Sequence, residues 1–237
     1  MPEPMLRYLA LGDSVATGAV THFMFTVPYP VLLRDSLARQ LGRPVLLVSR
    51  TRNGLTTRGM LRLLRRCPAL QREVRRAGLI TLSIGGNDLM KAAAVPGFSR
   101  ISAPAAQCGQ QEFLSCWPRL TALLRQLNPD AALEVMTIYN PYCLAPCPPC
   151  DSGLHRRTEA WLEPMNRQIL LSGAAGCTVA DVHGAFLSFS TGQMGRVVAM
   201  YPAGLLRNPH PTPCGQRLIA QCHLRALDPA ALAGQGK

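Results

Sequence analysis

The chain has 237 residues, of which 48% are hydrophobic, and a formal net charge of +12 at pH 7. This length and hydrophobic content fit a globular fold with a sizeable core and exclude a disordered or purely repetitive chain. No apolar run reaches the roughly eighteen uninterrupted residues that a membrane-spanning helix needs. We see no internal domain boundary, and we therefore expect a single domain over residues 1–237 without stable insertion into a membrane.

Short apolar runs bounded by turn residues predict strands at residues 5–11, 45–48, 79–84, 132–139 and 178–182. Apolar residues at helical spacing, with capping signals, predict helices at 29–41, 56–66, 68–77, 110–127, 155–171 and 212–226. The strands lack strict alternation of polar and apolar residues, as expected when both faces are covered. The alternation of strands and helices predicts an α/β fold, a doubly wound parallel sheet with helices on both sides.

Arginine supplies nearly all of the positive charge, since Lys91 and Lys237 are the only lysines. The basic residues are densest between residues 50 and 76, mostly on a predicted helix whose other face carries leucines. Such charge attracts nucleic acid, anionic lipid or acidic substrates. No nucleic-acid-binding motif accompanies it, and aromatic residues for base stacking make up 5% of the chain. We interpret the arginines as a solvated helix face and predict no nucleic-acid partner.

The nine cysteines leave the redox state of the chain open. Cys143, Cys147 and Cys150 lie in a proline-rich segment, close to His155. They fit disulfide bonds, a zinc site with His155 as the fourth ligand, or free and partly buried thiols. The sequence begins without a secretory signal, which favours the cytoplasm, whereas the cysteine count keeps secretion open.

The most informative segment is Gly12-Asp13-Ser14, directly after the first predicted strand. Ligands of doubly wound sheets bind beyond the carboxyl ends of the strands. A serine in that turn is exposed at the sheet edge, with the following backbone amides free to donate, which is the geometry of a nucleophile. The alternative is an ordinary turn between a strand and a helix.

Further groups suited to acyl chemistry follow other predicted strands. Gly54 and Asn87 each come after a strand, so a backbone amide and a side-chain amide could stabilise an oxyanion together with the amide of Ser14. We expect glycine at position 54 to permit both an unusual backbone conformation and a close approach that a side chain would block. His210 lies in a proline-rich turn before the last helix, which suits a base held in one orientation.

Four motifs occur in a recognisable order: Gly12-Asp13-Ser14, Asn53-Gly54-Leu55-Thr56-Thr57, Gly85-Gly86-Asn87-Asp88, and His210-Pro211 with Gly215. Over residues 8–220 the chain resembles the GDSL-type SGNH hydrolase family of esterases and lipases. The resemblance implies a flavodoxin-like three-layer α/β/α sandwich with a parallel five-stranded sheet. It also implies Ser14 as nucleophile, His210 as general base, and an oxyanion hole formed by Ser14, Gly54 and Asn87.

One position departs from the pattern of that family. An acidic residue usually stands three positions before the histidine, where this chain has Arg207, followed by Asn208. Asn208 or a backbone carbonyl could orient the imidazole instead, and Asp181 is a further candidate at the end of the last predicted strand. His183, beside Asp181, is an alternative base.

These observations predict a serine esterase or lipase that uses no metal or cofactor and acts on a small-molecule ester. Two alternatives share the site. One is an acyltransferase or deacetylase acting on a carbohydrate or lipid, and the other is a ligand-binding relative that has lost catalysis with the acidic orienter. The sequence predicts neither the acyl and alcohol groups nor the oligomeric state.

Overall fold

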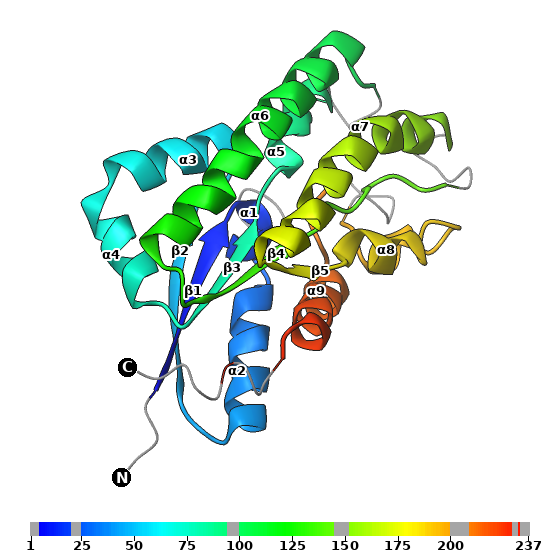
Figure 1. Ribbon diagram of the computed structural model, residues 1–237. Helices are drawn as coiled ribbons and strands as arrows, with labels where there is room; N and C mark the ends of the chain where they lie inside the picture. The colour runs from blue at the N-terminus through cyan, green and yellow to red at the C-terminus, as the bar shows by residue number, and fades with distance from the viewer. Residues whose placement is uncertain are drawn as a thin grey trace.

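A computed structural model describes residues 5–19, 25–93, 100–144, 152–199, 209–228 and 232. Its strands form one sheet in which every neighbouring pair is parallel, in the order β2-β1-β3-β4-β5 (Figure 1). The strands are β1 (Leu6–Gly12), β2 (Val45–Thr51), β3 (Leu79–Ser83), β4 (Ala132–Met136) and β5 (Thr178–Ala180). The predicted five-stranded parallel sheet is therefore confirmed.

Helices cover both faces of the sheet (Figure 1). The α-helices are α1 (Ser14–Thr17), α2 (Tyr29–Leu41), α3 (Thr57–Arg66), α4 (Pro68–Arg76), α5 (Gly86–Met90), α6 (Ala103–Leu127), α7 (Ser152–Leu171), α8 (Val182–Leu187) and α9 (Pro213–Ala226). Short 3₁₀ helices occur at η1 (Lys91–Ala93), η3 (Ser172–Ala175) and η4 (Met194–Arg196). In Figure 1, α2 and α9 lie on one side of the sheet, and α3, α4, α6 and α7 lie on the other. This is a three-layer α/β/α sandwich. None of the described helices is both long and apolar enough to cross a membrane.

Strand β1 shows why its sequence is apolar on both faces. Leu9 and Leu11 belong to the core that includes residues of α3, α4, α6 and α7. Tyr8 and Ala10 point the other way and pack with residues of α2. Successive side chains of a strand face opposite sides, so a central strand between two helical layers must be apolar throughout.

Several predicted boundaries differ from the structure. Strand β2 extends to Thr51 and helix α7 begins at Ser152, so both are longer than predicted. Helix α6 begins at Ala103, because Ser102 caps it by accepting a hydrogen bond from the Ala105 amide and a proline stands in its first turn. Strands β4 and β5 are shorter than predicted. Beyond them, Thr137 donates a hydrogen bond from its hydroxyl to Asp181, whose carboxylate caps α8, so these polar residues leave the sheet.

The strand order brings the candidate site residues to one edge. The chain runs from β1 to β2 on one side and then returns to β3 on the other side of β1. The carboxyl ends of β1 and β3 therefore flank the point where the winding reverses, the usual ligand position in such sheets. Ser14 follows β1 and Asn87 follows β3 at this point, and Gly54 follows the neighbouring strand β2.

Candidate active site

A cavity of about 510 Å³ lies at the carboxyl edge of the sheet. Ser14, Gly54, Asn87 and His210 all line it. These are the residues that the sequence predicts as nucleophile, oxyanion donors and base, and they come from segments up to 196 positions apart (14 to 210). The structure thus brings the four together in one cavity.

The turn that carries Ser14 is fixed by its neighbours. Gly12 has no room for a side chain, because a Cβ atom there would lie 2.4 Å from Ser83 Oγ. Asp13 caps α1, accepting a hydrogen bond from the Val15 amide at 3.0 Å. Ser14 is thereby the first residue of α1 and is 7% exposed. No hydrogen bond joins its hydroxyl or its backbone N–H to another described residue, so both groups are available to a ligand.

Gly54 adopts a φ of +72°, a conformation that residues with a side chain rarely take. The expected conformational reason for glycine therefore holds. A Cβ atom at this position would meet no protein atom within 4 Å, so the expected close approach concerns a ligand and stays a prediction. Like that of Ser14, the Gly54 N–H makes no hydrogen bond to the described part of the chain.

The side-chain amide of Asn87 is held by two acceptors. Its Nδ2 donates to Asp13 Oδ2 at 2.9 Å and to the Leu55 carbonyl oxygen at 3.1 Å. These bonds fix the amide nitrogen beside the Ser14 turn, and they engage both of its hydrogens. The sequence did not reveal this contact, because Asp13 and Asn87 are 74 positions apart.

The two buried carboxyl groups beside the site have raised pKa values. Burial raises the pKa of Asp13 to about 7, against the opposing effect of hydrogen bonds from Val15 and Asn87, and the nearby charge of Asp88 adds to the rise. Burial likewise raises the pKa of Asp88 to about 6. Asp88 Oδ2 accepts hydrogen bonds from the amide and the hydroxyl of Thr57, both at 3.0 Å, so this carboxylate holds the start of α3.

The turn that carries His210 is anchored on both sides. The buried Tyr139 hydroxyl donates to the Pro209 carbonyl oxygen at 2.5 Å. The Ala199 amide donates to the His210 carbonyl oxygen at 2.8 Å, and the Thr212 hydroxyl caps α9 by accepting from the Gly215 amide. The backbone of His210 is therefore held where its side chain lines the cavity.

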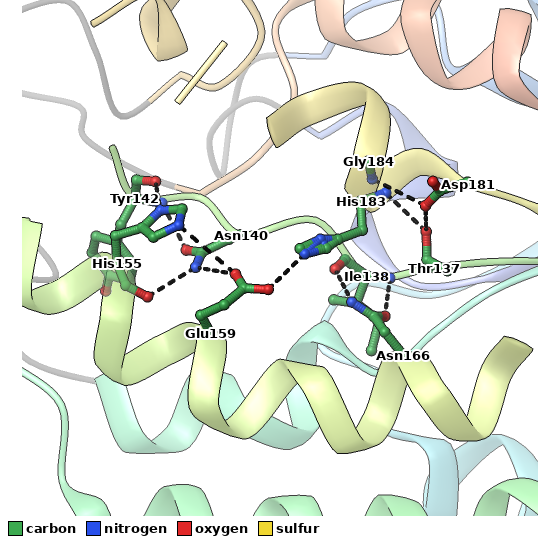
Figure 2. Close-up of polar contacts among 10 residues, drawn as sticks. All are labelled: Thr137, Ile138, Asn140, Tyr142, His155, Glu159, Asn166, Asp181, His183 and Gly184. Carbon is green, nitrogen blue, oxygen red and sulfur yellow. Dashed lines mark hydrogen bonds and ion pairs between the residues drawn. The ribbon is translucent and has the colours of Figure 1, made fainter. Parts of the chain in front are cut away.

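The predicted partners of His210 lie in different places. Arg207 and Asn208 fall outside the described residues. Asp181 lies at the start of α8, and Figure 2 shows its carboxylate between Thr137 and Gly184. Its Oδ1 accepts from the Thr137 hydroxyl and from the Gly184 amide, both at 3.0 Å. This carboxylate is thus engaged in capping a helix, and it is not among the described residues that line the cavity.

His183 belongs to a second polar cluster (Figure 2). Its Nε2 lies 2.7 Å from Glu159 Oε1, and the other Glu159 oxygen accepts from the Asn140 side-chain amide at 2.9 Å. On the same helix as Glu159, the His155 ring contacts the Tyr142 carbonyl oxygen through Nδ1 at 2.7 Å. None of the residues His155, Glu159 and His183 is among the described residues that line the cavity. The structure therefore separates His183, the alternative base, from Ser14.

The structure bears on the three interpretations of the cysteines (disulfide bonds, a zinc site or free thiols) only for the residues that it describes. Cys147 and Cys150 of the proline-rich segment lie outside them. Within the described ranges, no group of three or more His, Cys, Asp or Glu residues is placed to hold a metal ion. Free thiols are found at Cys67, Cys108, Cys116, Cys177, Cys214 and Cys222.

Residues 10–218 match the model of the GDSL-like lipase/acylhydrolase family. No curated protein matches the chain. Solved structures with the same fold include three hydrolases. The lipase Lip_vut3 from a goat rumen metagenome is 20% identical, with a TM-score of 0.71, covering 98% of this chain and 99% of its own. The extracellular lipase of Streptomyces rimosus is 17% identical, with a TM-score of 0.73, covering 94% and 100%. The acetylxylan esterase Axe2 of Geobacillus stearothermophilus is 15% identical, with a TM-score of 0.65, covering 95% and 96%.

Proposed function

Because this chain belongs to the GDSL-like lipase/acylhydrolase family, we propose that it is a serine hydrolase that cleaves carboxylic esters. The observation that carries the proposal is that Ser14, Gly54, Asn87 and His210 line one cavity. A hydroxyl nucleophile, an imidazole and several N–H donors are the groups that acyl transfer requires.

In the proposed mechanism, His210 accepts the proton of the Ser14 hydroxyl while Oγ attacks the ester carbonyl carbon. The carbonyl oxygen takes up the negative charge, and the alcohol leaves with a proton returned by the imidazolium. Water, deprotonated by the same imidazole, then attacks the acyl-enzyme and releases the carboxylic acid with Ser14 restored. No metal or cofactor takes part in these steps.

Three donors serve the developing oxyanion. The backbone N–H groups of Ser14 and Gly54 have no partner among the described residues, so they can donate without first losing a hydrogen bond. The Asn87 amide is the third donor and shares its hydrogens with Asp13 and Leu55. The two backbone donors lower the barrier because they need no reorientation when the charge forms, whereas Asn87 must share with the oxyanion a hydrogen that already bonds Asp13 or Leu55.

The imidazole of His210 needs a group that holds its orientation. Asp181 caps α8 through hydrogen bonds to Thr137 and Gly184. We therefore assign the orienting role in this proposal to Asn208 or a backbone carbonyl. A neutral orienter of this type works in enzymes with a Cys-His-Asn arrangement.

The test is hydrolysis of p-nitrophenyl butyrate by the wild type and by Ser14→Ala, with Ser188→Ala as the matched control. Ser188 is exposed, and its hydroxyl donates to the Ala185 carbonyl oxygen of α8, the helix that it follows. We expect Ser14→Ala to lose about 10³-fold or more in kcat and Ser188→Ala to retain wild-type activity. A fluorophosphonate should add covalently at Ser14. Ester hydrolysis that survives in folded Ser14→Ala, or a label at another residue, would refute the proposal.

A further inference from the structure

The wall of the cavity beside Ser14 is divided between two kinds of surface. One kind is polar, and its described side chains include Asp13, Ser14, Asn53, Ser83, Asn87 and His210. The rest is largely hydrocarbon, supplied by the segment after β3, by η1 and α6, by the end of β4 and by α7. Its apolar side chains include Ile84, Leu89, Met90, Ala92, Ala93, Ile101, Ala106, Met136, Ile138, Trp161 and Leu162.

This apolar wall offers few partners to a polar ligand. Although the chain has 25 lysines and arginines, no described lysine or arginine side chain lines the cavity. Thr158 lies among the apolar residues, but its Oγ1 is buried away from solvent. The Trp161 indole N–H is one of the few polar groups on this wall. Most hydroxyl groups of a sugar placed there would therefore lose hydrogen bonds to water without replacement, which costs binding energy. A hydrocarbon chain would gain by leaving water.

The size of the cavity points to more than a short acyl group. A water molecule occupies about 30 Å³ in the liquid, and a methylene group is of similar size. A cavity of about 510 Å³ therefore accommodates on the order of ten such groups, far more than the two carbons of an acetyl ester.

We propose that this cavity is an acyl-chain pocket that selects esters of medium-length, uncharged hydrocarbon acids over acetyl esters. The inference rests on the proposed function, since it names the acyl group that Ser14 would receive. The ester carbonyl lies at Ser14 between the N–H donors, and the hydrocarbon chain lies against the side chains of η1, α6 and α7.

The first experiment measures kcat/KM for p-nitrophenyl esters with acyl groups of two to twelve carbons, each corrected for its own rate of alkaline hydrolysis. We expect kcat/KM to rise by about fourfold for each added methylene, up to at least eight carbons, because each buried methylene adds a similar increment. A maximum at the acetyl ester, with Ser14→Ala inactive throughout, would overturn the pocket assignment and leave the proposed function intact.

A substitution that fills the pocket provides the second test. Ala106 on α6 is fully buried and lines the cavity, whereas the next residue, Gln107, is exposed. We expect Ala106→Phe to lower kcat/KM for the octanoyl ester by about tenfold or more and to leave the acetyl ester within about threefold. Gln107→Phe should keep the wild-type profile. An equal effect of Ala106→Phe on both esters, or none on either, would contradict the assignment.

Overpacking can destabilise a core, so thermal melting must accompany these assays. If Ala106→Phe does not fold, Ala106→Val is measured in the same way, with a smaller shift in the same direction expected.

Binding to folded Ser14→Ala separates this inference from the proposed function, because binding needs no turnover. Alkan-2-ones of three to twelve carbons carry a carbonyl group and have no ester bond to cleave. We expect their dissociation constants to fall by about fourfold per methylene. Binding that does not depend on chain length would refute the pocket, whether or not Ser14 is the nucleophile.

Discussion

The Asn87 amide nitrogen lies 2.9 Å from Asp13 Oδ2, so the turn that presents Ser14 also holds the side-chain donor proposed for the oxyanion. Asp13 caps the helix that begins with Ser14, and Asn87 follows β3, the strand that pairs with β1. One buried carboxyl group thus couples two parts of the site. Its bond to Asn87 keeps the amide in a single orientation before any substrate binds.

We predict that Asn87→Ala lowers kcat by about 10²- to 10³-fold while KM for a p-nitrophenyl ester changes by less than about threefold. The reason is that an oxyanion donor strengthens its hydrogen bond mainly in the transition state. Steady-state kinetics on the preferred ester checks both values.

The control for this prediction is Asn140→Ala. Asn140 also follows a strand, but its amide bonds Glu159 and the His155 carbonyl oxygen instead of residues at the cavity. We expect this variant to lower the melting temperature and to keep kcat within about threefold. Equal losses of kcat in the two variants would mean that Asn87 acts through stability alone.

The raised pKa of Asp13 predicts a specific dependence of stability on pH. With a pKa of about 7 in the folded state and 3.8 when unperturbed, the folded chain binds this proton more tightly than the unfolded chain. The free energy of unfolding should therefore fall as the pH rises between these two values, by about 1.4 kcal/mol per pH unit from this group.

The variant Asp13→Asn removes that titration, so the loss of stability between pH 4 and pH 7 should be smaller than in the wild type. A constant offset from the altered hydrogen bonds does not affect this slope. Urea unfolding at four pH values measures this slope, with Asp35→Asn, at a half-exposed position on α2, as the control. Parallel curves for Asp13→Asn and the wild type would show that Asp13 is ionised throughout this range.

The sequence predicted the parts of the fold that local patterns determine. The bounds of α2 follow from its apolar spacing and from Gly42, which ends the helix with a φ of +65°. Ser14, Gly54 and Asn87 were predicted because the carboxyl ends of parallel strands meet at one edge. His210 does not directly follow any of the described strands and was predicted from its proline-rich turn and from the resemblance to the family. The start of α6 was placed late, although Ser102 and the proline after it are capping signals.

Contacts between distant segments could not be predicted in the same way. The bond from Asn87 to Asp13 and the pairing of His183 with Glu159 depend on how whole elements pack. The apolar wall of the cavity was missed for a similar reason. Trp161 and Leu162 fit an ordinary amphipathic helix, and their position in the sequence does not distinguish a core contact from a cavity lining.

The separation of the two histidines gives the next prediction. His210 lines the cavity with Ser14, whereas His183 is held 2.7 Å from Glu159 in another cluster. We expect His210→Ala to lose about 10³-fold or more in kcat, because the Ser14 hydroxyl would lack its base. His183→Ala should retain kcat within about threefold. The opposite result in the two variants would make His183 the base.

A further buried carboxyl group, that of Glu134, lies on the opposite side of the sheet from α6. Glu134 in β4 and His223 in α9 are both fully buried, and His223 Nδ1 lies 2.9 Å from Glu134 Oε2. The His223 ring also stacks on Tyr29, with ring centroids 4.8 Å apart. Burial raises the pKa of Glu134, and the charge of His223 opposes that rise.

We predict that His223→Phe, which keeps a ring to stack on Tyr29, lowers the free energy of unfolding by about 3–5 kcal/mol, because it leaves the Glu134 carboxylate buried without its partner. The double variant Glu134→Leu with His223→Phe should recover most of that loss, since replacing both members of a buried pair with apolar groups is often neutral. Urea unfolding of the wild type, of Glu134→Leu, of His223→Phe and of the double variant completes this double-mutant cycle. Additive losses in the double variant would show that the two side chains contribute independently and that their proximity is not an energetic pairing.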